Sequence, residues 1–343
     1  MSAGPTTASE RRRASVGSTT GVGGPVTPMN RGPFSLYGFR TSGAPEPLSA
    51  PESDEPPAGA GPAAPRVWTV FALFGASVLA LLVGQFALAT IVVLVTGDAR
   101  EAFARLSTPG GFLATALLFE ALLAAAAVGA AVLSPVAWRE RLHLQAGRLS
   151  CLGTFAAVAG ALAVSQGFES LMALGVVPRS PALEGLGELI GALSGWSIAG
   201  GVLVIGIAPG IAEELMFRGY VQTRLVERWG AAPGILTASL LFGILHVDPV
   251  HAAFAFGIGV FLGYLTLWTG SIRAAIVCHA ANNTASTLTT VWGFEIAGRK
   301  ANLAACAASA IVLGLALSYL RRFRGGASRG ESAGSREADG FED

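Results

Sequence analysis

Two adjacent glutamates and an arginine interrupt an apolar stretch in the second half of the chain. Glu213, Glu214 and Arg218 follow the run Leu189 to Ala212, which contains no charged residue. A charge at bilayer depth costs at least about 3 kcal/mol, so these residues need a reason to be there. Glu214 and Arg218 are spaced to form an ion pair within one helix, which could be purely structural. Glu213 points about 100° away from Glu214 and has no such cation, which suits a general base.

Two histidines and an asparagine occur at matching depth in other apolar segments. Counted at about 1.5 Å per helical residue, Glu213, His246 and Asn283 come roughly 15 to 20 Å from the cytoplasmic face, near mid-membrane. His279 stands one turn before Asn283 on the same helix face. Alone, each histidine would more often be a core residue, and the asparagine would more often hold helices together. Their common depth favours one shared site.

The chemistry that suits these groups is hydrolysis. Glu213 would take a proton from water, His246 would pass a proton to the leaving amine, and His279 with Asn283 would stabilise an oxyanion. A zinc ion held by Glu213, His246 and His279 is an equally open alternative. Gly-x-Ser-x-Gly occurs only in the polar C-terminal tail and His-Glu-x-x-His is absent, which disfavours serine hydrolases and zincins.

The composition is that of an integral membrane protein. Of 343 residues, 52% are hydrophobic and 13% charged, with a mean hydropathy of +0.57. An average soluble domain has roughly 25% charged residues. The net charge of +1 and the scattered arginines make nucleic acid an improbable partner. The expected partners are the lipid bilayer and a membrane-anchored peptide or protein substrate; no oligomeric state is indicated.

Eight apolar segments approach the roughly 20 residues that a membrane-spanning helix needs. They predict an all-α polytopic membrane protein, a bundle of about eight transmembrane helices around a polar intramembrane catalytic cavity. The segments are Val67 to Gly97, Pro109 to Trp138, Leu149 to about Val177, Leu189 to Ala212 and beyond, Trp229 to His246, Ala252 to Thr269, Ala274 to Phe294, and Ala301 to Leu320.

Composition also divides the chain along its length. Residues 1–65, rich in Pro, Gly and Ser, predict a disordered cytoplasmic tail; 66–322 form the transmembrane helical domain; 323–343 form a second disordered polar tail. The arginines in alternate loops favour both termini in the cytoplasm. The single lysine, Lys300, beside 22 arginines suggests a GC-rich bacterial genome, hence a bacterial cytoplasmic membrane.

Other polar residues suggest ordinary structural roles. Glu120 and Glu169 lie in apolar segments without a motif, so helix packing or lining of the cavity mouth is expected. Asp248 and His251 flank Pro249 in a turn near the outer face, where solvated helix capping is expected. Phe242 could orient His246 or merely pack against it.

Three motifs together resemble the CPBP family of intramembrane proteases, which includes type II CAAX prenyl endopeptidases and bacteriocin-processing or immunity-associated proteins. The stretch from Glu213 to Arg218 resembles Glu-Glu-x-x-x-Arg, Phe242 to His246 resembles Phe-x-x-x-His, and His279 to Asn283 resembles His-x-x-x-Asn. Their order and spacing fit over about residues 149–292.

The resemblance implies a role for each motif residue. Glu213 would activate water with His246 as its partner, and His279 and Asn283 would stabilise the oxyanion. Arg218 and Glu214 would organise the helix, with Glu214 assisting at the site, and Phe242 would support it. The family has been interpreted both as metalloprotease and as glutamate protease, so the possible zinc ion remains open.

The expected function is therefore an intramembrane endopeptidase acting on membrane-associated or lipid-modified peptides or proteins. One alternative is a non-enzymatic immunity or scaffold protein that uses the polar layer to hold helices together. Another is a proton-coupled transporter, which the lack of an inverted repeat in the sequence disfavours.

Overall fold

The computed structural model describes residues 66–325, which belong to the second of two units, Gly61–Asp343. The predicted tails, 1–65 and 323–343, lie outside the described residues, except that 323–325 close a short 3₁₀ helix, η3 (Arg321–Gly325). Every regular element between residues 66 and 325 is a helix. This confirms the all-α prediction.

The described part begins with a pair of long helices, α1 (Trp68–Thr96) and α3 (Pro109–Val132), joined by the short α2 (Ala99–Leu106). Asp98 caps the N-terminus of α2, where its carboxylate accepts a hydrogen bond from the backbone N–H of Glu101 at 2.8 Å. The prediction that the second segment continues to Trp138 is wrong. The helix ends before Pro135, which cannot continue a helical hydrogen-bond ladder.

One continuous helical span of 34 residues, Trp196–Trp229, carries both glutamates. It consists of α7 (Trp196–Gly201), the π-helical η1 (Val202–Ile207), α8 (Ala208–Glu214), the π-helical η2 (Leu215–Gln222) and α9 (Thr223–Trp229). Pro209 lacks an N–H, which accounts for a wider turn just before it. The predicted start at Leu189 is wrong: that residue lies in α6 (Pro181–Gly191), and Gly195 with φ of 54° separates the two helices.

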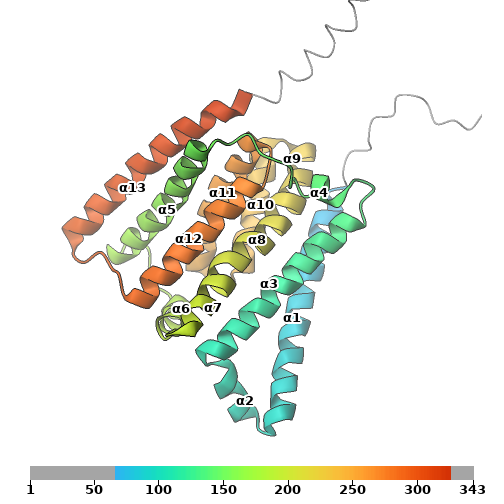
Figure 1. The fold of residues 1–343 in the computed structure, drawn as a ribbon, viewed down its shortest axis with the longest axis vertical. Coiled ribbons are helices and arrows are strands. Elements are labelled where there is room, and N and C mark those ends of the chain that lie inside the picture. Colours follow the sequence, from blue (N-terminus) through green and yellow to red (C-terminus); the bar gives the residue numbers. More distant parts are fainter. Residues whose placement is uncertain (1–65, 326–343) are drawn as a thin grey trace, which may run out of the picture. The chain divides into compact units, whose positions relative to one another are not determined.

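The remaining long helices are α5 (Cys151–Ala173), α10 (Ala231–Leu245), α11 (Pro249–Thr269), α12 (Arg273–Trp292) and α13 (Arg299–Leu320); α4 (Trp138–Arg141) is one short turn. In Figure 1 the helices α13, α5, α12, α8, α3 and α1 follow one another side by side, and each of these neighbours is in contact. Helices α10 and α11 pack behind them, with α11 touching α5, α12 and η2.

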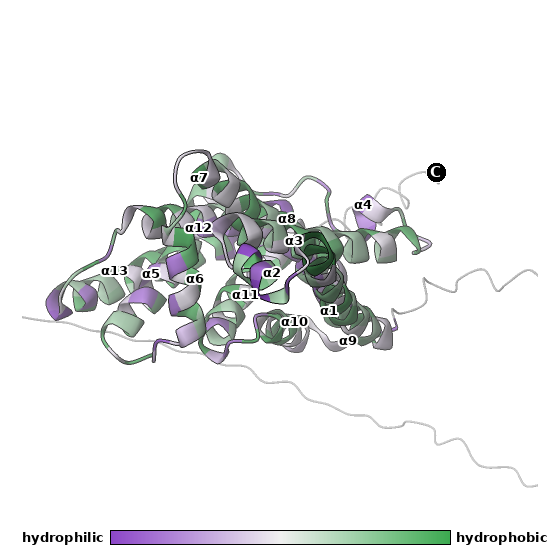
Figure 2. Cartoon of the chain, turned by 90° about the horizontal axis from the view of Figure 1, so that it is seen from below, coloured by the Kyte–Doolittle hydropathy of each residue, from purple (hydrophilic) through white to green (hydrophobic). Residues whose placement is uncertain are grey.

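Six helices of the described part are long and apolar enough to cross a membrane. The other two of the eight predicted segments are also helical, but α10 has only 15 residues, and α12 carries too many polar side chains to meet the same measure. Helix α12 packs between α5, α8 and α11, whereas α10 keeps an exposed apolar face with Leu236, Leu240 and Ile244. In Figure 2, α1 and α3 are coloured almost entirely as hydrophobic. The chain is an integral membrane protein.

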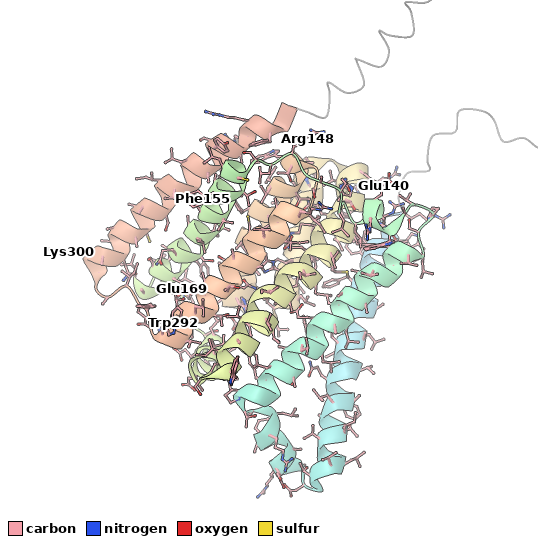
Figure 3. The ribbon with its side chains drawn as sticks, in the orientation of Figure 1. Glu140, Arg148, Phe155, Glu169, Trp292 and Lys300 are labelled. Atoms are coloured by element: carbon pink, nitrogen blue, oxygen red, sulfur yellow. The ribbon has the colours of Figure 1, made fainter. Side chains whose placement is uncertain are left out.

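Four labelled residues show where the two ends of the helices lie. Figure 3 places Glu140 and Arg148 near one end of the bundle, and Glu169 and Trp292 toward the other. The polar motif residues lie between these ends, on helices that cross the interior.

Candidate active site

The glutamates are held close to α12 by two small residues on their own helix. A Cβ added at Gly210 would lie 2.7 Å from the backbone nitrogen of Ala280, and one at Gly206 would lie 2.5 Å from Oγ1 of Thr284. Glycines four residues apart therefore let the two helix backbones approach, as in small-xxx-small helix contacts. This contact brings the histidine of α12 beside Glu213.

Glu214 is the centre of the hydrogen-bond network. Arg218 Nη1 donates to its Oε1 at 2.6 Å, and His279 Nδ1 donates to the same oxygen at 2.8 Å. The carboxylate and the guanidinium are almost completely buried, at 0% and 1% exposed. The predicted ion pair within one helix is confirmed, and a histidine from another helix joins it.

His279 connects the two glutamates. Because its Nδ1 carries the hydrogen donated to Glu214, its Nε2 is directed to the side of Glu213, 3.5 Å from Oε2. Glu213 is also buried, at 5% exposed. The sequence had suggested His246 as the partner of Glu213, whereas the contact that the structure shows is with His279.

His246 ends α10 with a fixed tautomer. Its Nδ1 lies 2.9 Å from the carbonyl oxygen of Phe242, and because a carbonyl only accepts, Nδ1 carries the hydrogen. In the neutral ring Nε2 is then free to accept a proton. The residue is half-buried.

Phe242 packs between the motifs. Its ring meets His246 at 4.9 Å and His279 at 5.9 Å between centroids, both edge to face, and the Arg218 guanidinium lies 4.5 Å from its centre. The ring therefore packs against both histidines and the arginine, and the orienting role that the sequence suggested stays a prediction.

Asn283 lies one turn from His279, half-buried, and its Oδ1 accepts from Asn282 Nδ2 at 3.3 Å. Asn282 is the more buried of the two, and its own Oδ1 accepts from Ser165 on α5 at 2.5 Å. The sequence analysis did not single out Asn282 or Ser165. A second asparagine directly beside the motif was the only signal.

The turn after His246 also differs from expectation. Asp248 does cap α11, accepting from the backbone N–H of His251 at 2.8 Å and of Val250 at 3.1 Å, and these bonds lower the pKa of its carboxyl. The His251 ring, however, is half-buried with its centroid 4.3 Å from that of His246. It belongs to the site rather than to a solvated turn.

Glu120 on α3 faces the same cluster. It is 7% exposed, and its Oε2 has no hydrogen-bond partner within the described residues. Helix α3 packs on α8, which carries Glu213, and on η2. An isolated glutamate in an apolar segment gave no sequence signal for this position.

The proposed zinc ligands do not converge as they stand. Nδ1 of His246 and Nδ1 of His279 each donate to an oxygen atom, as in metal-binding histidines, so the tautomers leave both Nε2 atoms available and it is the grouping of the side chains that decides. In the part of the chain described by the structure, no three His, Cys, Asp or Glu side chains are grouped closely enough to hold a metal ion. The set Glu213, His246 and His279 therefore does not fit a three-ligand site in this arrangement.

The polar layer forms a closed, packed cluster, and open space lies beside it. A cavity of about 310 Å³ between α5, α11 and α13 is lined almost entirely by apolar groups, including Phe168, Phe254 and Gly257. The Phe254 ring stacks on His251 at 6.4 Å, and His251 in turn meets His246. The apolar cavity thus adjoins the histidine end of the polar cluster.

Comparison with known proteins gives one match. Residues 195–285 match the family model described as "Type II CAAX prenyl endopeptidase Rce1-like". No curated protein and no solved structure shows a significant match to the chain. The matched range contains all three motifs, from the glutamates of α8 to Asn283 of α12. Residues 195–285 are therefore similar to the Rce1-like family, in agreement with the resemblance to the CPBP family of intramembrane proteases that the motifs suggested.

Proposed function

We propose that the chain is an intramembrane endopeptidase that cleaves membrane-associated or lipid-modified peptides or proteins at this cluster. The observation that supports this most is the buried chain of contacts Arg218–Glu214–His279–Glu213, with distances of 2.6, 2.8 and 3.5 Å. It holds a carboxylate and an imidazole side by side on two helices. Such an arrangement suits general acid–base chemistry more than helix packing.

In this mechanism Glu213 is the general base. Its carboxylate accepts a proton from water, and the resulting hydroxide attacks the carbonyl carbon of the scissile peptide bond. The proton is then delivered to the leaving amine as the C–N bond breaks. His246 supports that transfer, because its Nε2 is the ring nitrogen left free by the bond to Phe242.

His279 and Asn283 are proposed to stabilise the oxyanion. Glu214 accepts a hydrogen bond from Nδ1 of His279, so Nε2 can donate to an oxyanion only when the ring carries a hydrogen on both nitrogens, and in this role His279 acts as the imidazolium beside Glu213. Asn283 accepts from Asn282 through Oδ1, which leaves its amide N–H groups to donate. Two such donors are a usual way to hold developing negative charge.

The substrate class follows from the apolar cavity. Its walls are the side chains of membrane helices, and its histidine edge leads to His246 through Phe254 and His251. A lipid chain or apolar peptide segment bound there would place the adjoining peptide bond near the polar cluster. We propose the bilayer as the second partner and no nucleic acid partner.

We further propose a bacterial cytoplasmic membrane with both termini in the cytoplasm, supported by the arginine distribution in the loops. We propose water activated by Glu213 without a metal, because the candidate zinc donors do not converge. A zinc-bound water is the competing mechanism.

The test uses the purified full-length protein in lipid and a set of membrane-anchored peptides, with products identified by mass spectrometry. Glu213→Gln should lower kcat by at least about 100-fold, because the base is lost while the shape is kept. Glu101→Gln, on an exposed helix, is the matched control and should cleave normally. Each protein is also assayed with a chelator and after zinc is restored.

Unchanged cleavage by Glu213→Gln would contradict the assignment of the base. Loss of activity in the chelator and its recovery with zinc would favour the metal-bound water. A folded wild type that cuts no peptide would favour the immunity or scaffold function.

A further inference from the structure

A column of buried polar atoms leads away from the glutamates. Nη2 of Arg218, Oε1 of Gln222, Oγ of Ser239 and Oγ1 of Thr266 have no hydrogen-bond partner among residues 66–325. All four side chains are at least nine-tenths buried. Buried polar atoms are nearly always paired, with protein or with ordered water, so four in one region require an explanation. These four residues are called the polar column below.

Glycines on α11 show that the first members of the column are neighbours. A Cβ placed at Gly259 would lie 3.2 Å from both Ser239 Oγ and Phe242 Cδ1. The Arg218 guanidinium lies on the other side of the contact, 4.5 Å from the Phe242 ring. Phe242 and Ser239 therefore meet at Gly259, and Arg218 is the neighbour of the Phe242 ring.

The next members continue along the same face of α11. A Cβ at Gly263, one turn after Gly259, would lie 2.7 Å from Gln222 Oε1, and Gln222 Nε2 donates to the Gly263 carbonyl at 2.9 Å. Thr266 follows three residues later, on the same face. The column ends near Thr269, whose carbonyl accepts from Arg148 N at 3.2 Å. Figure 3 places Arg148 at that end of the bundle.

The two hydroxyls of the column behave unlike other hydroxyls in the bundle. Ser77, Thr269 and Thr287 each donate to the carbonyl four residues earlier, at 2.8 Å. Ser239 and Thr266 make no such bond. Since a helical Ser or Thr in an apolar setting ordinarily bonds its own backbone, these two hydroxyls have a different partner.

We propose that a file of ordered water molecules binds along the polar column, from Arg218 to Thr266, and carries water and protons between the candidate site and the Arg148 end. The column offers one N–H donor, one amide acceptor and two hydroxyls that can do both, which is the set a hydrogen-bonded water chain needs. The guanidinium disfavours a metal cation in the same place. The delivery role rests on the proposed function, whereas the binding of water does not.

The binding of water is tested by crystal structures of the full-length protein grown from a lipid phase. Wild-type maps should show water within hydrogen-bond distance of Gln222 Oε1, Ser239 Oγ and Thr266 Oγ1. Thr266→Val should lose the water next to residue 266. Thr269→Val, the matched control three residues further on, should keep every water, because the Thr269 hydroxyl is already bonded to Leu265.

A map that resolves buried water elsewhere but shows none along the column would overturn the proposal, as would density with the short, regular coordination of a cation. If Thr266→Val does not fold, Gly263→Ala gives a second test, because its methyl group would lie 2.7 Å from both Gln222 Oε1 and Ile235 Cγ2 and must push the amide oxygen out of its place in the column. It should displace at least one water.

The delivery role is tested separately by kinetics. Gly263→Ala should lower kcat roughly threefold to tenfold with KM unchanged. Gly314→Ala on α13, where an added methyl meets no atom within 4 Å, should leave both unchanged. Normal kcat in a Gly263→Ala protein whose maps lack the water would reject delivery but not binding. If the wild-type protein has no peptidase activity, the proposed function is rejected. The binding of water is then still tested by the crystallographic maps alone.

Discussion

Two Glu–Arg pairs in this chain have the same spacing and the same length but opposite surroundings. Arg105 and Glu101 in α2 lie 2.6 Å apart with side chains 60% and 49% exposed. Arg218 and Glu214 also lie 2.6 Å apart, with side chains 1% and 0% exposed. In the sequence the two pairs look alike, since in each the glutamate lies four residues before the arginine.

The difference lies in what burial demands of each pair. An exposed pair keeps its water and contributes about 0 to 1 kcal/mol to stability. A buried pair loses that water and must find further partners. Glu214 accepts a hydrogen bond from His279, and the Arg218 guanidinium packs on the face of the Phe242 ring. The spacing therefore predicts an ion pair in both places, but only the buried pair recruits groups from other helices and so assembles a site.

The largest effect on stability is expected from breaking the buried pair. Arg218→Met leaves the Glu214 carboxylate uncompensated in the interior and should lower the free energy of unfolding by about 3 to 5 kcal/mol. The measurement is reversible unfolding in lipid bicelles. A loss below about 1 kcal/mol would show that the buried pair behaves like an exposed one.

The double variant Glu214→Leu/Arg218→Met sharpens this result. If the cost comes from the stranded charge, removing both charges should be less destabilising than Arg218→Met alone. Additive losses would instead assign the cost to packing. In either case the His279 ring loses its anchor, so peptide cleavage should not return.

A smaller effect is expected at the aromatic ring that touches both histidines. Phe242→Leu should lower the free energy of unfolding by about 1 to 2 kcal/mol through lost packing. If the ring also orients His246 and His279, kcat should fall with little change in KM. Leu262→Ala, a buried change on α11 away from the motifs, is the control for packing loss alone. Equal kcat in the two variants would assign Phe242 to packing only.

A comparison of two exposed glycines tests the apolar cavity. Gly257 lines the cavity and Gly75 lies on α1, and at both an added Cβ meets no atom within 4 Å. Gly257→Phe should raise KM for a lipid-modified peptide roughly fivefold, since displaced apolar contact is worth about 1 kcal/mol. Gly75→Phe should leave KM unchanged. Equal KM values would remove the cavity from the substrate path.

Much of this fold could be predicted from the sequence, because a helix that crosses the bilayer must be apolar over about 20 residues and is therefore visible in the hydropathy. All eight apolar segments are helical, but their ends were set by local backbone chemistry. Pro135 ended α3 early, and Gly195 divided the predicted run from Leu189. The short α2 and α6 were missed because they are too short to cross a membrane.

The candidate site was predicted less completely. Equal depth was predicted for Glu213, His246 and Asn283 from the residue count along each helix, and the contact that the structure shows for Glu213 is with His279, one turn from Asn283. The rotation of each helix about its axis does not follow from that count. For this reason the contact of His251 with His246, and the packing of α3, which carries Glu120, on α8, became visible only in three dimensions.

The smallest effect is expected at the exposed pair, and it completes the comparison. Arg105→Met should lower the free energy of unfolding by no more than about 0.5 kcal/mol, because water replaces the lost partner of Glu101. Even this should vanish in 1 M salt, where charges are screened beyond about 3 Å. The loss in Arg218→Met should persist at the same salt, because ions do not reach a side chain 1% exposed. A large, salt-resistant loss in Arg105→Met would mean that spacing, and not burial, gives these pairs their strength.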